Sequence, residues 1–196
     1  MQYRKQPKLK NSCLIALGSN LSSTTGTPLE TLTFTLRLFD AESIKIRKMS
    51  NWYKTPAFPA GSGPDYVNGV VLVETTDTPE AVLKTLHKIE KNIGRTRDNR
   101  WEPRICDLDL LSYGTEIRPD ISTFRKWQDL PLSDQKTMTP EQMILPHPRL
   151  QDRAFVLVPM RDVVPDWVHP VSGITLNELI NALPSEDIEQ IQVISP

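Results

Sequence analysis

Two closely spaced aspartates and four arginines lie between Gly94 and Gly114, in the sequence GRTRDNRWEPRICDLDLLSYG. Asp107 and Asp109 are two residues apart, so both carboxylates would project from the same face of an extended strand. Carboxylate oxygens suit Mg²⁺, which keeps other coordination positions for water and substrate phosphate. Arginine can bind phosphate through two hydrogen bonds, and four are nearby: Arg95, Arg97, Arg100 and Arg104. The segment therefore predicts a site where metal ions and phosphate groups meet.

The strand that would carry the aspartates is indicated by its apolar residues. Five of them could anchor it in a core: Ile105, Cys106, Leu108, Leu110 and Leu111. Taken alone, an Asp-x-Asp pair is more often part of a solvated, ion-paired surface strand. The neighbouring arginines favour the metal and phosphate interpretation.

Length and composition indicate one globular domain. The chain has 196 residues, of which 38% are hydrophobic and 24% charged, as in ordinary soluble domains. Its formal net charge of -1 gives no general attraction to nucleic acid or an anionic membrane, so we expect neither as a partner. We see no apolar run near the roughly 20 residues of a membrane span, and the polar, basic start has no signal-peptide core. We expect a cytoplasmic protein with a disordered leader over residues 1–11 and a single domain over 12–196.

The cysteines and histidines do not suggest a second kind of chemistry. Cys13 and Cys106 lie in apolar runs typical of buried strands, where a reduced thiol behaves as a small hydrophobic group. His87 and His169 are interpreted as structural. We find no His/Cys cluster that indicates zinc and no convincing nucleophile and base pair for covalent catalysis.

Strand and helix patterns alternate along the chain. Thr78 and Pro79 form a typical helix start, with a capping side chain followed by proline at the first helical position. Strands are expected at Ser12–Leu17, Ile44–Trp52, Tyr66–Thr75 and Ile105–Tyr113, and helices at Pro28–Phe39, from Pro79 to about Ile93, and at Leu176–Leu183. The order β-α-β-β-α-β predicts an α+β fold with a ferredoxin-like core, in which helices lie on one face of a mainly antiparallel sheet.

Several stretches, taken in order, resemble the 6-hydroxymethyl-7,8-dihydropterin pyrophosphokinase family of folate biosynthesis. They are ALGSNL, YKTPAF followed by PDYVNGVV, IEKNIGRTR, RWEPRICDLDLLSYG and LPHPRLQDRAFVLVPMRDVVPD. The resemblance extends from about Leu14 to Asp166 and implies an α+β sandwich. It also implies transfer of pyrophosphate from ATP to the pterin hydroxymethyl group, with release of AMP. Such chemistry depends on positioning and charge neutralisation, which acids with metals and arginines can supply.

The resemblance implies roles for the residues that would handle ATP. Asp107 and Asp109 would coordinate two Mg²⁺ ions that bridge the phosphates. Arg95 would stabilise developing charge, and Glu90 would lie near the substrates. Phosphate would be bound by Arg97, Arg104, Arg153 and His147, the last of which could instead bind ribose. A solvated surface position is the alternative for each arginine.

The pterin is a flat heterocycle, so its pocket should combine aromatic faces with polar groups at the edge. By resemblance, Tyr66 and Phe155 sandwich the ring and Asn68 recognises its polar edge. Without the resemblance, Tyr66 and Phe155 would be interpreted as core residues. The backbone around Thr55, Pro56 and Phe58 would complete the pocket, and Trp101 would close over the site.

Three features depart from the family pattern. Glu102 stands where the family usually has glycine, and adds negative charge near the phosphates. Gln142 and Ile144 replace an arginine and a threonine that contact ATP in some members. Residues 115–141, which include Trp127, form an insertion of about 20 residues whose structure the pattern leaves open.

Two other functions remain compatible with the sequence. A catalytically weak homologue could bind pterin or nucleotide and use the insertion to contact a partner, such as another folate-pathway enzyme. A metal-dependent phosphohydrolase would share the acids but lack the pterin pocket. The retained aspartates favour the Mg²⁺-dependent pyrophosphokinase, and the identity of the product separates the three.

Overall fold

A computed structural model describes residues 11–57, 63–94 and 104–194 of the chain. Four predicted site residues lie outside these ranges: Phe58, Arg95, Arg97 and Trp101. The expected leader over residues 1–11 also lies outside them except for Asn11, which begins the first strand.

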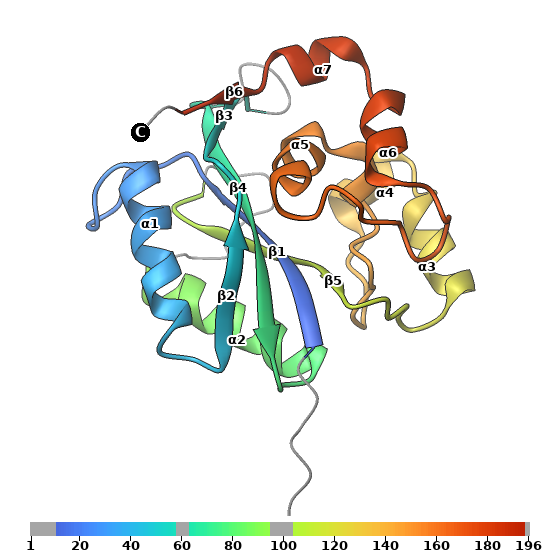
Figure 1. Ribbon diagram of the computed structural model, residues 1–196, viewed down its shortest axis with the longest axis horizontal. Helices are drawn as coiled ribbons and strands as arrows, with labels where there is room; N and C mark the ends of the chain where they lie inside the picture. The colour runs from blue at the N-terminus through green and yellow to red at the C-terminus, as the bar shows by residue number, and fades with distance from the viewer. Residues whose placement is uncertain (1–10, 58–62, 95–103, 195–196) are drawn as a thin grey trace, which may run out of the picture.

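The centre of the molecule is an antiparallel sheet (Figure 1). β1 lies between β4 and β5, and β2 and β3 pair with successive parts of β4. A short strand near the end of the described chain, β6, pairs with β3. The strands are β1 (Asn11–Ser19), β2 (Ile44–Met49), β3 (Tyr53–Thr55), β4 (Tyr66–Thr75), β5 (Asp107–Tyr113) and β6 (Gln192–Val193). The strand expected over Ile44–Trp52 is therefore shorter, and a separate strand follows it.

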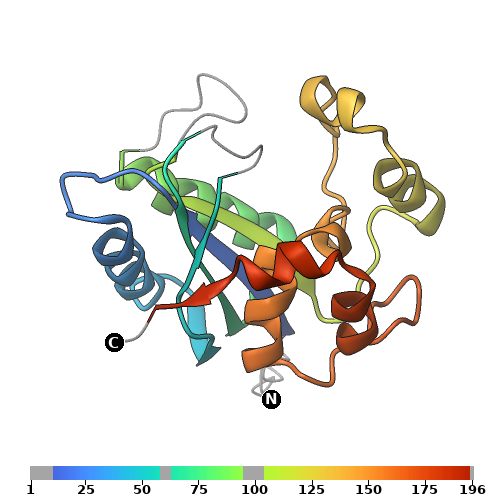
Figure 2. The same ribbon diagram turned by 90° about the horizontal axis from the view of Figure 1, so that it is seen from above.

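Helices cover both faces of this sheet (Figures 1 and 2). On one face, α1 (Pro28–Phe39) and α2 (Pro79–Asn92) enclose the first core cluster. On the other face, α5 (Ala154–Val163) and α6 (Leu176–Ala182) enclose a second cluster. The two helices of the predicted β-α-β-β-α-β order, α1 and α2, share one face as expected, but the expectation that helices cover only that face was wrong. The physical reason is that β1 is apolar on both sides, as strands covered on both faces are.

The first two helices are each capped by a threonine side chain. Thr27 and Glu30 form a capping box at α1, in which each side chain accepts a hydrogen bond from the other residue's backbone. Thr78 accepts from the Ala81 N–H at 3.3 Å, and Pro79 occupies the first helical position of α2, as predicted. These contacts satisfy amide groups that the helix itself leaves free.

The insertion at residues 115–141 contains two helices, α3 (Ile121–Gln128) and α4 (Leu132–Thr137). The Phe124 side chain of α3 is fully buried, with its ring centroid 5.6 Å from that of His169. His169, expected to be structural, is 1% exposed and packs edge-on against Trp167 at 5.5 Å. Arg149 donates hydrogen bonds to the carbonyls of Gln128 and Leu130, at 2.7 and 3.0 Å. The insertion is therefore packed and tethered rather than irregular.

The remaining elements are a 3₁₀ turn (Leu150–Asp152) just before α5 and α7 (Ser185–Glu189) just before β6. Cys13 and Cys106 are buried and not joined by a disulfide, as expected, and burial raises the pKa of the Cys13 thiol to about 12. Within the described part of the chain, no helix has the length and apolar character needed to cross a membrane.

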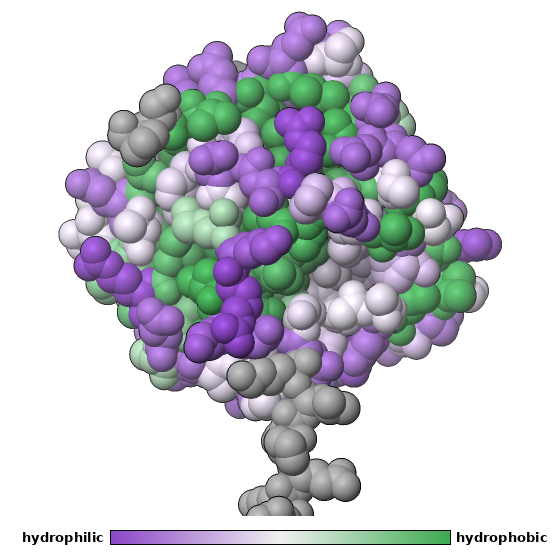
Figure 3. Space-filling view, viewed as in Figure 1, coloured by the Kyte–Doolittle hydropathy of each residue, from purple (hydrophilic) through white to green (hydrophobic). Residues whose placement is uncertain are grey.

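Polar and apolar residues are interspersed over the surface seen in Figure 3. That surface therefore does not single out one apolar docking face.

Candidate active site

The register of three strands places the predicted polar residues on one face of the sheet. Gly18 in β1 is opposite Asp107 in β5 and opposite Asn68 in β4. Residues directly opposite each other share a face, as do residues two apart along a strand. Asp109 and Tyr66 therefore join this group. Further along the same strands, that face is covered by α5.

Gly18 gives the Asn68 side chain the room that it needs. A Cβ atom added at Gly18 would lie 2.9 Å from Asn68 Oδ1, closer than such atoms pack without a shift. Asn68 is 7% exposed, and its Nδ2 donates to Thr55 Oγ1 at 2.7 Å. The carboxamide orientation assigned by this hydrogen bond directs Oδ1 toward Gly18. The predicted pterin residues Thr55, Tyr66 and Asn68 are thus brought together by β3 and β4.

The two aspartates each face an arginine. Arg104 forms a close ion pair with Asp107, and Arg153 Nη1 lies 3.6 Å from Asp109 Oδ2. Burial lowers the pKa of Arg104, but the charge and hydrogen bond of Asp107, with a smaller contribution from the charge of Asp109, act against it and the net pKa is raised. The aspartate side chains remain 19% and 38% exposed, so a ligand can still reach them.

His147 lies beside this charged group as a neutral ring. Its backbone N–H donates to the carbonyl of Leu111 in β5 at 2.8 Å, and its Nδ1 accepts from the Arg149 N–H at 3.1 Å. Burial, followed by the positive charge of Arg153, lowers the pKa of His147 to about 3, against the opposing effect of Asp107. The hydrogen-bond pattern assigns the ring proton to Nε2, which makes that nitrogen a donor.

Arg153 connects the phosphate and pterin halves of the predicted site. It is the residue that precedes α5, and its side chain reaches Asp109. Its guanidinium carbon also lies 5.7 Å from the centre of the half-buried Phe155 ring, within the range of a cation–π contact. The start of α5 thus brings together one residue predicted for ATP and one predicted for the pterin.

Glu90 occupies a position that its sequence context does not reveal. Its side chain, on α2, is 1% exposed, and its Oε1 accepts the N–H of Leu108 at 2.8 Å. Leu108 lies between Asp107 and Asp109, so this buried carboxylate holds the backbone of the strand that carries both. Glu90 therefore lies close to the strand of the two aspartates, and its predicted part in ATP binding stays a prediction.

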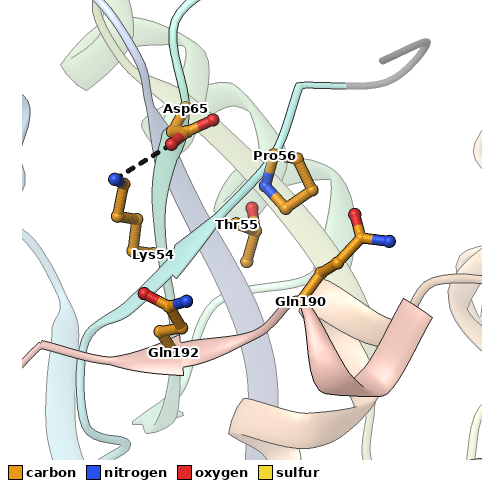
Figure 4. A pocket seen from close by; sticks show the side chains of 6 residues that line it. All are labelled: Lys54, Thr55, Pro56, Asp65, Gln190 and Gln192. Atoms are coloured by element: carbon orange, nitrogen blue, oxygen red, sulfur yellow. Dashed lines mark ion pairs between the residues drawn. The ribbon is translucent and has the colours of Figure 1, made fainter. Parts of the chain in front are cut away.

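A pocket of about 170 Å³ lies next to this face (Figure 4). Of the predicted pterin residues, Thr55 and Pro56 line it. Its other lining residues are Lys54, Asp65, Gln190 and Gln192. The two glutamines come from the end of the described chain and were missed at the sequence level, as were Gly18 and Arg149. The clearest available signal was the ALGSNL stretch, which contains Gly18 and in which β1 ends at Ser19.

An antiparallel sheet that presents paired carboxylates, arginines and a buried carboxamide has the composition of a group-transfer enzyme that handles phosphates. Residues 14–165 match the family model described as 7,8-dihydro-6-hydroxymethylpterin-pyrophosphokinase (HPPK), and the chain belongs to this family.

Proteins with the family's activity name are similar over most of the chain. The 2-amino-4-hydroxy-6-hydroxymethyldihydropteridine pyrophosphokinase of Synechocystis is 33% identical, and the aligned region covers 89% of this chain and 77% of the relative. The enzyme of the same name from Pseudomonas aeruginosa is 34% identical, with 90% and 94% covered. A bifunctional folate synthesis protein of Pisum sativum is 32% identical over 77% of this chain, which spans 25% of that protein.

Solved structures share the fold at low sequence identity. A triple mutant of Plasmodium falciparum HPPK-DHPS superposes with a TM-score of 0.66 and 16% identity, covering 97% of this chain and 46% of the other. Another HPPK-DHPS, crystallised in complex with substrates, has a TM-score of 0.61 and 12% identity, with 88% and 43% covered. The chain thus spans less than half of these two-part proteins.

Proposed function

We propose that the protein transfers pyrophosphate from ATP to the hydroxymethyl group of 6-hydroxymethyl-7,8-dihydropterin, a step of folate biosynthesis that releases AMP. Family membership supports this activity. The observation that carries it at the level of the site is the strand register around Gly18, which places Asp107 and Asn68 on the same sheet face. A phosphate-handling group and a heterocycle-binding group are then adjacent, as transfer between two substrates requires.

Asp107 and Asp109 are the proposed metal ligands. Their oxygens suit Mg²⁺, they share one sheet face, and both remain partly exposed. In the described part of the chain, no group of three or more His, Cys, Asp or Glu side chains is arranged to hold a metal. A site with two carboxylates would therefore take its other ligands from phosphate and water. Two bound Mg²⁺ ions would neutralise phosphate charge.

Three cationic or donor groups around the aspartates are proposed to bind the ATP phosphates. Arg104 and Arg153 would exchange their carboxylate partners for phosphate oxygens, which bind the guanidinium fork equally well. The Nε2–H of His147 would donate one hydrogen bond without adding charge, because the pKa of the ring is so low. Arg153 also precedes the N-terminus of α5, where the helix dipole favours anions.

The pterin is proposed to lie between the aromatic rings of Tyr66 and Phe155, with its polar edge on Asn68. Thr55 fixes the carboxamide of Asn68, so the amide is oriented before the ligand arrives. Thr55 and Pro56 would form the adjacent wall. The assignments of Phe58, Trp101, Arg95 and Arg97 stay predictions from the sequence.

Glu90 is proposed to act as a positioning residue for β5. We also propose that the fold is ferredoxin-like, which the strand order β5-β1-β4 with β2 beside β4 supports. The cytoplasmic location, the single domain over 12–196 and an association with another folate enzyme remain proposals. The two-part relatives motivate the last of these.

The test is AMP formation from ATP, with and without 6-hydroxymethyl-7,8-dihydropterin and with Mg²⁺ present or chelated. The pterin product is followed by mass. Pterin-dependent AMP together with a diphosphorylated pterin is the expected result. Phosphate release without an acceptor would instead identify a phosphohydrolase, and pterin binding without turnover would identify a binding module.

A further inference from the structure

The short strand β6 lies beyond residues 14–165, which match the family, yet it pairs with a strand that carries a proposed pterin residue. Gln192 and Val193 lie opposite Lys54 and Tyr53 of β3. The Ile194 N–H continues this pairing by donating to the carbonyl of Trp52 at 2.8 Å. β3 is therefore held on both sides, by β4 and by β6.

β3 is three residues long, and without β6 it would be the edge of the sheet, with β4 as its neighbour. A short edge segment with few contacts opens more readily than the centre of a sheet. The residue at its end is Thr55, whose hydroxyl accepts the 2.7 Å hydrogen bond from the carboxamide of Asn68. The order of β3 thus determines how firmly that carboxamide is held.

A second contact leads from β6 to the same place. Trp52, whose carbonyl accepts from Ile194, packs its ring against Gly69 so closely that an added Cβ there would lie 2.8 Å from the ring. Gly69 follows Asn68 in β4. The segment that contains β6 also contributes Gln190 and Gln192 to the pocket wall beside Thr55 and Pro56 (Figure 4).

We propose that β6 is a positioning element of the pterin site: by pairing with β3 it fixes Thr55, and through Thr55 the carboxamide of Asn68. The inference rests on the proposed function, since it assigns Asn68 to the pterin. The proposal predicts that β6 contributes to the affinity for the pterin. It predicts no contribution to the affinity for ATP, whose proposed ligands lie on β5 and at the start of α5.

The test variant is Ile194→Pro, which removes the N–H that bonds to Trp52. Hydrogen-bonding groups alternate in direction along an antiparallel edge strand, so the N–H of Val193 points away from β3. Val193→Pro, at a residue that is 53% exposed, is therefore the matched control for introducing proline. Ile194→Ala controls for the lost side chain. Gln192→Pro, whose missing N–H would also point toward β3, serves as the second test variant if Ile194→Pro is unfolded; Gln192→Ala is its control, because Gln192 also lines the pocket.

Ile194→Pro is expected to raise KM for the pterin about five- to tenfold, the scale of one lost hydrogen bond. KM for ATP and kcat should stay within about twofold. Hydrogen exchange should accelerate in peptides covering residues 53–56. The Val193→Pro and Ile194→Ala variants should resemble the unmodified protein in all of these measurements.

The inference is overturned if exchange accelerates while KM for the pterin is unchanged, or if both KM values rise together. It is also overturned if Val193→Pro has the same effect as Ile194→Pro, or if exchange over residues 53–56 does not change. Failure of the proposed function looks different, because the unmodified protein would then form no AMP with the pterin. Direct titration with 6-hydroxymethyl-7,8-dihydropterin would replace KM in that case, and unaltered affinity in Ile194→Pro would reject the role of β6.

Discussion

The sheet face beneath α5 has two halves that use the same strands for opposite purposes. In one half, Leu14, Val70 and Leu111 are buried in the core under α5. In the other half, Asn68 lies two residues before Val70, and Asp109 lies two residues before Leu111. Alternation assigns a residue to a face, but the place where the covering helix begins decides whether it becomes core or site.

The largest effect that would test this division is loss of a site carboxylate. Asp107→Asn and Asp109→Asn keep the shape of each side chain but remove its charge, which the proposed metal site needs. We expect each to lower kcat by about 10²–10³-fold, the range seen when one electrostatic contact is removed from a reacting centre. Steady-state AMP formation measures this loss, and thermal unfolding should show little change.

Asp166→Asn is the control for this prediction, because Asp166 is an exposed aspartate away from the sheet face. It should leave kcat unchanged. Near-normal turnover in either site variant would show that the proposed metal ligands are wrong.

The apolar half should respond in the opposite way. Leu157 of α5 is fully buried in the second core cluster, so Leu157→Ala removes apolar contacts and leaves a cavity. We expect the free energy of unfolding to fall by about 2–5 kcal/mol, measured by urea unfolding. Both KM values should stay near normal at a temperature where the variant is folded.

Leu86→Ala, on α2 under the opposite face, offers a comparison for Leu157→Ala. Leu86 is also fully buried, and its loss should cost similar stability with equally small effects on KM. A selective rise in one KM for Leu157→Ala would mean that the two halves of the α5 face are not separate.

The polar half was easier to predict from sequence than the elements around it. Asp107 with Asp109, and Tyr66 with Asn68, are each spaced by two residues within clear strand patterns, so their shared faces follow from strand geometry alone. Their meeting across β1 depends on register, which involves residues far apart in sequence. The two-residue spacing indicates each pair separately. Only the register of the folded sheet places both pairs on either side of Gly18.

The missed features depend on contacts that short segments do not encode. α3 has one fully buried large apolar residue, Phe124. Its sequence therefore lacks the helical repeat of apolar residues that would identify a packed helix. β6 is two exposed residues whose strand conformation comes from β3. Glu90 is typical of an exposed helix position until Leu108 is packed against it.

A smaller effect is expected from Gly18→Ala, which tests whether the polar half depends on close packing. The new methyl group would come within 2.9 Å of Asn68 Oδ1 and push the carboxamide off its Thr55 partner. We expect pterin affinity to fall about tenfold, measured by titration, with little change for ATP. In an Asn68→Ala background the same substitution should have almost no further effect, because the clashing atom is gone. Additive losses in this double-mutant cycle would contradict the mechanism.

A further effect, without any substitution in the sheet, should appear in the pH dependence of stability. The folded pKa of His147 is about 3, below the value near 6.5 of an unfolded chain. Between these values the unfolded state binds the proton and the folded state does not, so this contribution to stability is complete above about pH 6.5 and declines as the pH falls toward 3.

His147→Gln, which keeps a neutral donor but cannot titrate, tests this contribution. The other titrating groups contribute equally to the pH dependence of both proteins. Between pH 7.5 and 5, the free energy of unfolding should therefore fall by about 1–2 kcal/mol more in the unmodified protein than in the variant. Urea unfolding at both pH values measures the difference. Equal losses in the two proteins would show that His147 is protonated as easily in the folded site as in the unfolded chain, and that it does not serve as a neutral donor beside Arg153.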